Sequence, residues 1–227
     1  RGLDRWCLWM DTEDFDPRDI ERSPLLKERV LGCSAFRSHS TKQITKDGAK
    51  TAHLFQENHQ PLGPYVGIPS VVSETRRFYT VAHLSEQVIA GNQLYTALDP
   101  DSFLFAIISS SMFITWQRAV GGHMKSDLRF ANKIVWNTLP LPEVSDKQRA
   151  AIIAAGQGIL EARAEQPGAS LADMYNPLAM SPSLLKAHRI LDRAVDRAFG
   201  ARKALETNEQ RLTILFKRYQ EMTATEN

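Results

Sequence analysis

Strand-like runs occupy the middle of the chain, and helical spacing dominates its last third. Three runs rich in β-branched and aromatic residues, each bounded by polar turns, are typical of β-strands; they cover residues 65–72, 78–84 and 88–98. Asp99-Pro100-Asp101-Ser102 then favours the start of a helix. Phe103 to Val120 is apolar on nearly all sides, which predicts a helix buried against the sheet.

The segment from Ser126 to Pro142 predicts a final strand. It begins with polar and apolar residues in alternation, continues through Ile134-Val135-Trp136, and ends at Pro140 and Pro142. Proline lacks the N–H group that a sheet ladder needs, so the strand must end or lie on an edge there. The prolines therefore mark a boundary between two regions.

Beyond this boundary the pattern is helical. Helix-forming composition and apolar spacing predict helices over residues 146–164, 183–199 and 208–222. We therefore predict an α+β fold with two domains. Residues 1–142 form a mixed β-sheet domain with a buried helix, and residues 143–227 form an all-α domain.

The first 60 residues have a weaker pattern. Arg5 to Met10 is a strand candidate. Clustered acids follow it, and Asp16-Pro17 predicts a helix with Asp16 as N-cap, running to about Val30. Residues 36–60 are polar and weakly patterned, which favours a loop or hairpin that either carries phosphate contacts or is simply solvated.

Composition and charge exclude some classes of protein. A 43% hydrophobic content over 227 residues supports a real core, and the net charge of +2 is small for a dedicated DNA-binding domain. Between Arg29 and Pro142, however, 11 basic residues face 7 acidic ones, which allows one basic face. Two cysteines without metal spacing, and no signal peptide or bilayer-length apolar run, predict a cytoplasmic protein that does not span a membrane.

The turn Ser73-Glu74-Thr75-Arg76-Arg77 lies between two strand candidates and carries charges of both signs. Arginine can donate two parallel hydrogen bonds to guanine, and glutamate can accept one from the cytosine amino group. The turn is therefore chemically suited to reading a base pair. The alternative is a surface ion pair between Glu74 and Arg76 or Arg77, which would contribute little energy.

Two longer motifs carry a resemblance to a known family. Arg129 to Pro140, read as R-F-A-N-K-I-V-W-N-T-L-P, resembles an element in the target-recognition regions of MmeI-like DNA methyltransferases and fused restriction-modification enzymes. Near the C-terminus, Tyr175-Asn176-Pro177, Met180-Ser181-Pro182, and the run from Leu185 to Asp196 resemble a second element of the same family, with Ser181 inserted. The resemblance covers almost the whole chain, but only the C-terminal part of such enzymes.

The resemblance implies that this chain recognises double-stranded DNA for a methyltransferase domain of the same parent chain. In this family a similar S-E-x-R turn contributes base discrimination, which assigns base reading to Glu74 and Arg76. Backbone contacts are then expected from basic and hydroxyl side chains that can donate to phosphate: Arg37, Ser40, Lys42, Ser73, Arg77, Lys125 and Arg129.

Catalytic motifs are missing from the sequence. Methylation of the adenine amino group in such enzymes uses S-adenosylmethionine, a glycine-rich loop and an Asn-Pro-Pro-Tyr motif, whereas Asn176-Pro177-Leu178-Ala179 lacks the second proline and the aromatic residue. We therefore expect no catalysis and no cofactor in this chain. The parent is expected to be an adenine-specific methyltransferase, with or without a fused nuclease.

Other readings stay open from the residues alone. One is a metal-dependent nuclease that uses Asp11, Asp14 and His123; another is a structural module that docks a partner protein. His188 and Asp192 are four residues apart and share a helix face, which could in principle serve a metal. Without a third ligand nearby, a buried histidine bonded to a carboxylate or backbone carbonyl is the preferred interpretation.

Overall fold

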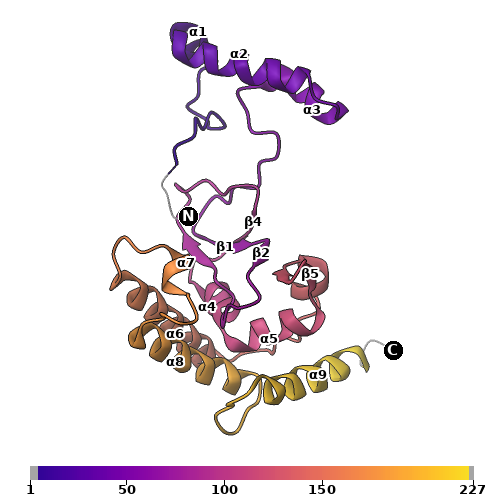
Figure 1. Ribbon diagram of the computed structural model, residues 1–227, viewed down its shortest axis with the longest axis vertical. Helices are drawn as coiled ribbons and strands as arrows, with labels where there is room; N and C mark the ends of the chain where they lie inside the picture. The colour runs from indigo at the N-terminus through magenta and orange to yellow at the C-terminus, as the bar shows by residue number, and fades with distance from the viewer. Residues whose placement is uncertain (1–4, 225–227) are drawn as a thin grey trace. The chain divides into compact units, whose positions relative to one another are not determined.

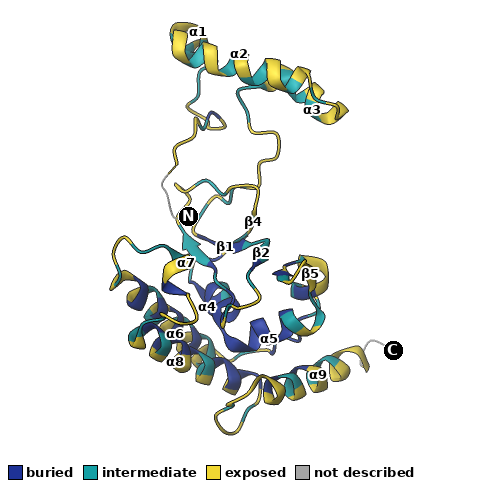
Figure 2. Cartoon of the chain, viewed as in Figure 1, coloured by how far each residue is buried: buried dark blue, intermediate teal, exposed yellow. Residues whose placement is uncertain are grey.

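The computed structural model describes residues 5–224, which fall into two compact units. The smaller unit is Leu3–His59, and the larger one contains Gln60–Asn227. Figure 1 shows the course of the chain and Figure 2 the burial of its residues. Each unit is described by itself.

The smaller unit consists of short helices with little core. Its elements are α1 (Arg18–Arg22), α2 (Pro24–Ser38), α3 (Gln43–Asp47) and the 3₁₀ helix η1 (Gly48–Thr51), and none of them contains a buried residue. In Figure 2 these helices are coloured as exposed or intermediate. Among the described residues of this unit, Met10 is the buried hydrophobic one.

Two predictions for this unit were wrong, and the predicted helix is confirmed except for one break. Arg5 to Met10 form no strand. The expected helix after Asp16 is interrupted at Ser23, whose hydroxyl accepts from Leu26 N and starts α2, with Pro24 in the first turn. Residues 36–60 are largely helical up to Thr51, because the Arg37 guanidinium donates to the carbonyls of Gly48, Thr51 and Leu54 and folds the segment back on α2.

The larger unit contains two three-stranded antiparallel sheets. One has the order β3 (Ala82–Leu84), β1 (Tyr65–Pro69), β4 (Leu94–Leu98), with Gly67 opposite Ala82 on one side and Thr96 on the other. The other has the order β2 (Val71–Val72), β6 (Asp127–Arg129), β5 (Gly122–Met124). The three strand-like runs are thus confirmed as the source of β1 to β4, although Phe78, Tyr79 and Val81 are buried outside a ladder.

The apolar helix is buried as expected, but it is broken in two. α4 (Phe103–Ser109) and α5 (Ser111–Val120) meet at Ser110 with a bend of 63°. Asp99 caps α4 by accepting from the amides of Leu104 and Phe105, and Ser110 Oγ caps α5 by accepting from Phe113 N. In the described part of the chain no single helix has the length and apolar character of a membrane span, and only this bent pair has them jointly.

The expected strand from Ser126 to Pro142 is the largest correction. Only β6 is a strand, and Asn132–Trp136 form a π-helical turn, η2. Buried Phe130 and Val135 lie five positions apart, and Asn137 N donates to the Asn132 carbonyl at 2.9 Å. This spacing fits a wide helical turn rather than the two-residue alternation of a strand.

The last third is helical, as predicted. It contains α6 (Asp146–Ala164), α7 (Leu171–Met174), α8 (Pro182–Ala198) and α9 (Asn208–Ala224). α6 packs so closely on α4 that a Cβ built at Gly156 would lie 2.7 Å from Ala106 Cβ. One core runs through the sheets, α4, α5 and the C-terminal helices, so the α+β class is confirmed.

Candidate nucleic-acid interface

The Ser73–Arg77 segment, called the recognition turn below, follows β2 directly and has a fixed backbone. Arg76 N donates to the Ser73 carbonyl at 3.0 Å, and Glu74 N donates to Asp127 Oδ1 at 3.2 Å. Arg118 Nη2, from α5, donates to the carbonyls of Glu74 at 3.3 Å and Arg76 at 2.7 Å. The turn is therefore held by β6 and α5 rather than by its own charged side chains.

The Glu74 and Arg77 side chains remain available. Both are exposed, and among the described residues no ion pair joins Glu74 to Arg76 or Arg77. Arg76 is half-buried, and its Nη1 donates to the Ala172 carbonyl of α7 at 3.1 Å. The surface ion pair considered from the sequence is thus not formed, and Arg76 is oriented by the C-terminal helical region.

The β5–β6 hairpin brings two more of the predicted backbone contacts close to the turn. Arg129 is exposed and lies opposite Val71, two residues before Ser73. Lys125 is exposed in the hairpin turn, where its φ of 59° is left-handed. Glu74, Arg76, Ser73, Arg77, Lys125 and Arg129 therefore belong to one neighbourhood built on β2, β5 and β6.

The other three predicted contacts, Arg37, Ser40 and Lys42, belong to the smaller unit. The Arg37 guanidinium is used by backbone carbonyls, as described above. Ser40 Oγ accepts from Lys42 N at 3.2 Å, and the Lys42 side chain is exposed.

A buried hydrogen-bond chain, called the junction below, joins α6, Tyr175, α8 and the segment before β3. Arg163 of α6 donates to the Tyr175 hydroxyl through Nε at 3.0 Å and Nη2 at 2.7 Å, and through Nη1 to the Val81 carbonyl at 2.8 Å. The Tyr175 hydroxyl lies 2.8 Å from His188 Nε2, and because it accepts from Arg163 its own hydrogen points to the imidazole. Burial lowers the pKa of His188 to about 3, so this ring is neutral.

His188 does not pair with Asp192. Asp192 instead accepts from Ser111 N and Ser111 Oγ, both at 2.7 Å, which ties α8 to α5. One turn later, Asp196 accepts from Arg211 Nε at 3.0 Å and Nη2 at 2.8 Å. Burial raises the pKa of Asp196 to about 6 in spite of Arg211. In the described chain no set of three His, Cys, Asp or Glu side chains is placed to hold a metal ion.

Comparison with protein families decides what this architecture is. The family model described as the MmeI target recognition domain matches residues 1–143, and that of the MmeI C-terminal domain matches residues 144–226. The chain belongs to the MmeI family. The two motifs that suggested this relationship from the sequence are the segment around η2 and the segment that supplies Tyr175, His188, Asp192 and Asp196.

Two similar proteins show how much sequence identity and length this chain shares with known proteins. DNA methyltransferase A of Bacillus subtilis (strain 168) is 36% identical over 219 residues, which is 96% of this chain and 24% of the relative. A solved structure of the Type IIL restriction-modification enzyme MmeI in complex with DNA is 37% identical, with a TM-score of 0.88, over 96% of this chain and 29% of that one. The chain thus spans about a quarter of the length of these relatives.

Sequence reasoning missed the residues that hold the recognition turn. Arg118 lies in the helix predicted to be apolar on nearly all sides, and Asp127 lies in the segment predicted to be the final strand; neither was a candidate site residue. The one signal that could have found Arg118 is its charge in an otherwise apolar helix, since a half-buried arginine must satisfy its donors. Its partners, two backbone carbonyls more than 40 residues away, leave no mark in the sequence.

Proposed function

We propose that this chain is the sequence-reading part of a DNA methyltransferase of the MmeI family. The observation that carries the proposal is the recognition turn, whose backbone is fixed by Arg118 and Asp127 while the Glu74 carboxylate is free and exposed. A rigid turn with free polar ends is what base-edge readout requires, because a mobile reader would lose entropy on binding.

Each predicted residue has a role in this proposal. Glu74 and Arg76 read base edges, while Ser73, Arg77, Lys125 and Arg129 hold the backbone of double-stranded DNA around them. Lys42 and Ser40 supply further contacts to the DNA backbone from the smaller unit. Arg37 holds their segment in place through its hydrogen bonds to backbone carbonyls. The solved MmeI relative is a complex with DNA, which supports DNA as the partner.

The chemical step belongs to the longer protein. The methyltransferase relative supports S-adenosylmethionine as methyl donor in a methyltransferase domain of the same parent chain. Adenine N6 is the acceptor that the family resemblance implies. This chain would position the DNA so that the target base can leave the stack. The free thiols Cys7 and Cys33 fit a reducing, cytoplasmic location.

Selection from a randomised duplex pool, at low and moderate salt, tests the proposal. The full-length protein should enrich a motif, and Arg76→Ala and Glu74→Lys should relax or change one position of it with little loss of backbone affinity. Glu161→Lys and Arg202→Ala, exposed residues outside the turn, are matched controls that should leave the motif unchanged. Absence of any enriched motif for the unaltered protein would refute the proposal and favour a structural module.

A further inference from the structure

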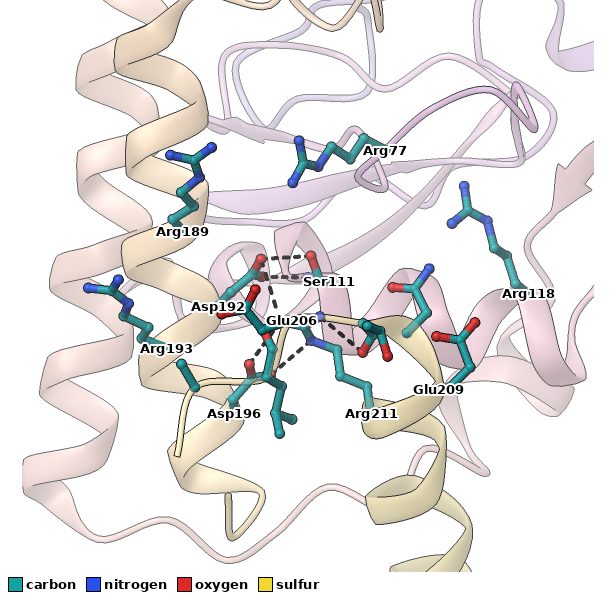
Figure 3. Close-up of a pocket in the computed structure, with 14 residues that line it drawn as sticks. Arg77, Ser111, Arg118, Arg189, Asp192, Arg193, Asp196, Glu206, Glu209 and Arg211 are labelled. Atoms are coloured by element: carbon teal, nitrogen blue, oxygen red, sulfur yellow. Dashed lines mark hydrogen bonds and ion pairs between the residues drawn. The ribbon is translucent and has the colours of Figure 1, made fainter. Parts of the chain in front are cut away.

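An open pocket of about 680 Å³ lies beside the recognition turn and is rich in arginine. Arg77 comes from the turn itself, Arg118 from α5, and Arg189 and Arg193 from α8. Figure 3 shows these side chains around the Asp192–Ser111 pair. Arg118, Arg189 and Arg193 were not candidate site residues in the sequence analysis.

Aromatic stacking brings Arg77 to α8. The Arg77 guanidinium lies 5.5 Å from the centre of the Phe78 ring, and Phe78 stacks on His188 with ring centres 3.7 Å apart. Arg189 is the next residue after His188. In Figure 3 the guanidinium groups of Arg77 and Arg189 face each other across the pocket. The recognition turn and the C-terminal helical region therefore both contribute to its positive side.

The arginines on this side form no ion pair within 4 Å in the described part of the chain. Arg77, Arg189 and Arg193 are exposed. Of the nearby acids, Asp196 accepts twice from Arg211. Asp192 accepts twice from Ser111; burial raises the pKa of Asp192, and the charges of Arg211 and Arg77 oppose that shift. Glu206 and Glu209 line the other side of the pocket, beside Arg211.

This arrangement carries a small energetic cost. Arg189 and Arg193 are four residues apart on α8, where like charges repel each other and destabilise a helix. An anion bound between them and Arg77 would remove that repulsion. A planar guanidinium donates two parallel hydrogen bonds to a phosphate, and the pocket is wide enough for a phosphodiester.

We propose that Arg77, Arg189 and Arg193 bind a phosphodiester of the DNA backbone, so that α8 of the C-terminal domain grips the strand next to the recognition turn. This inference rests on the proposed function, because it assigns the phosphate to DNA. It extends that function to a second region of the chain. Arg118 contributes positive charge to the same site while its Nη2 holds the turn.

The test compares two double variants of the full-length protein on the same duplex. Arg189→Met with Arg193→Met removes the charges on α8 and leaves the turn unaltered. Lys147→Met with Lys217→Met removes the same charge from exposed positions outside the pocket. Thermal unfolding midpoints equal to that of the unaltered protein establish that both double variants keep the fold.

Salt dependence is the first measurement. Each lost phosphate contact lowers the slope of log affinity against log salt by about 0.9. The arginine variant should lose about 1–2 in slope and roughly 10-fold in affinity, for matched and unmatched sequences alike. The lysine variant should lose markedly less.

Replacing single phosphates by neutral methylphosphonates is the second measurement. The unaltered protein should be weakened at one or two positions beside the base pair read by the turn, and the arginine variant should no longer respond there. Identical sensitivity of both proteins at every phosphate would overturn the inference. If the unaltered protein binds no preferred sequence, the proposed function is wrong. If it binds a preferred sequence but the α8 arginine variant responds to each methylphosphonate as the unaltered protein does, only the phosphate-site inference is wrong.

Discussion

The junction and the recognition turn both contain arginine, but the arginines at the junction hold the fold together whereas Arg77 in the turn is exposed to solvent. At the junction Arg163 is buried, and its Nε, Nη1 and Nη2 all donate to protein groups, while Arg211 is held by Asp196. At the turn, Arg77 is exposed and the Glu74 carboxylate is unpaired among the described residues. An arginine's surroundings, not its position in a motif, distinguish support from recognition. Four variants test this distinction.

The largest effect is expected from Arg211→Met, which leaves Asp196 buried without its partner. Breaking a buried ion pair from one side costs about 3–5 kcal/mol, because the remaining charge is desolvated. Chemical denaturation should show this loss at neutral pH. Lys217→Met on the same helix removes an exposed cation, 3.9 Å from Glu221, and should cost no more than about 0.5 kcal/mol. A loss below about 1 kcal/mol for Arg211→Met would place it with the surface residues.

The pH dependence of stability should report His188. The pKa of its imidazole is about 3 in the folded protein and 6.5 ordinarily, so its contribution is complete above pH 6.5 and is lost as pH falls toward 3. Between pH 6.5 and about pH 5 the loss is about 1.5 kcal/mol. Asp196, with its pKa raised to about 6, has the opposite effect over the same range.

His188→Gln separates these two groups. Glutamine can still accept from the Tyr175 hydroxyl but does not titrate, so the difference between the unaltered protein and the variant isolates the histidine. Urea denaturation at several pH values measures that difference. A difference that stays constant from pH 7 to pH 5 would show that His188 is not buried as described.

A smaller loss is expected from Arg118→Met, which removes the donor to the Glu74 and Arg76 carbonyls. The hydrogen bonds contribute about 1 kcal/mol to stability, because water can replace the donor at this half-buried position. The loosened turn should also discriminate less between base pairs. Arg202→Met, exposed in the loop before α9, is the control, and equal stability and specificity in both variants would contradict the supporting role.

Glu74→Gln should have the smallest effect on stability, within about 0.5 kcal/mol, because the side chain is exposed. Recognition should nevertheless change. Glutamate accepts from the cytosine amino group, whereas glutamine pairs with adenine, so the preference at one position should move from cytosine toward adenine. Duplex selection measures this, and an unchanged motif would remove Glu74 from the reading residues.

The parts that the sequence predicted correctly are those determined by neighbours in the chain. Ser145 and Gln148 form a capping box that starts α6, and Asp99 caps α4 as its position suggested. The recognition turn was placed between its strands for the same reason. Local signals of this kind need only a few adjacent residues.

The errors arose where distant contacts decide the structure. Ile134-Val135-Trp136 have strand propensity, yet Trp116 Nε1 donates to the Val135 carbonyl at 3.1 Å, which stabilises a π-helical turn under α5. The break between α4 and α5 depends on Asp192 accepting from Ser111, 81 residues earlier. The junction likewise joins Val81, Arg163, Tyr175 and His188, whose spacing in the sequence gives no reason to pair them.

The bond from Arg76 to the Ala172 carbonyl has a consequence for how new specificities arise. The residue proposed to read a base depends for its direction on a peptide group almost a hundred positions later, in a different domain of the family. If only the recognition turn were exchanged between relatives, Arg76 would be moved without the carbonyl group that orients it. Target preference should therefore be inherited together with the matching α7 segment. Recombination between the turn and α7 should yield enzymes that discriminate less well between target sequences.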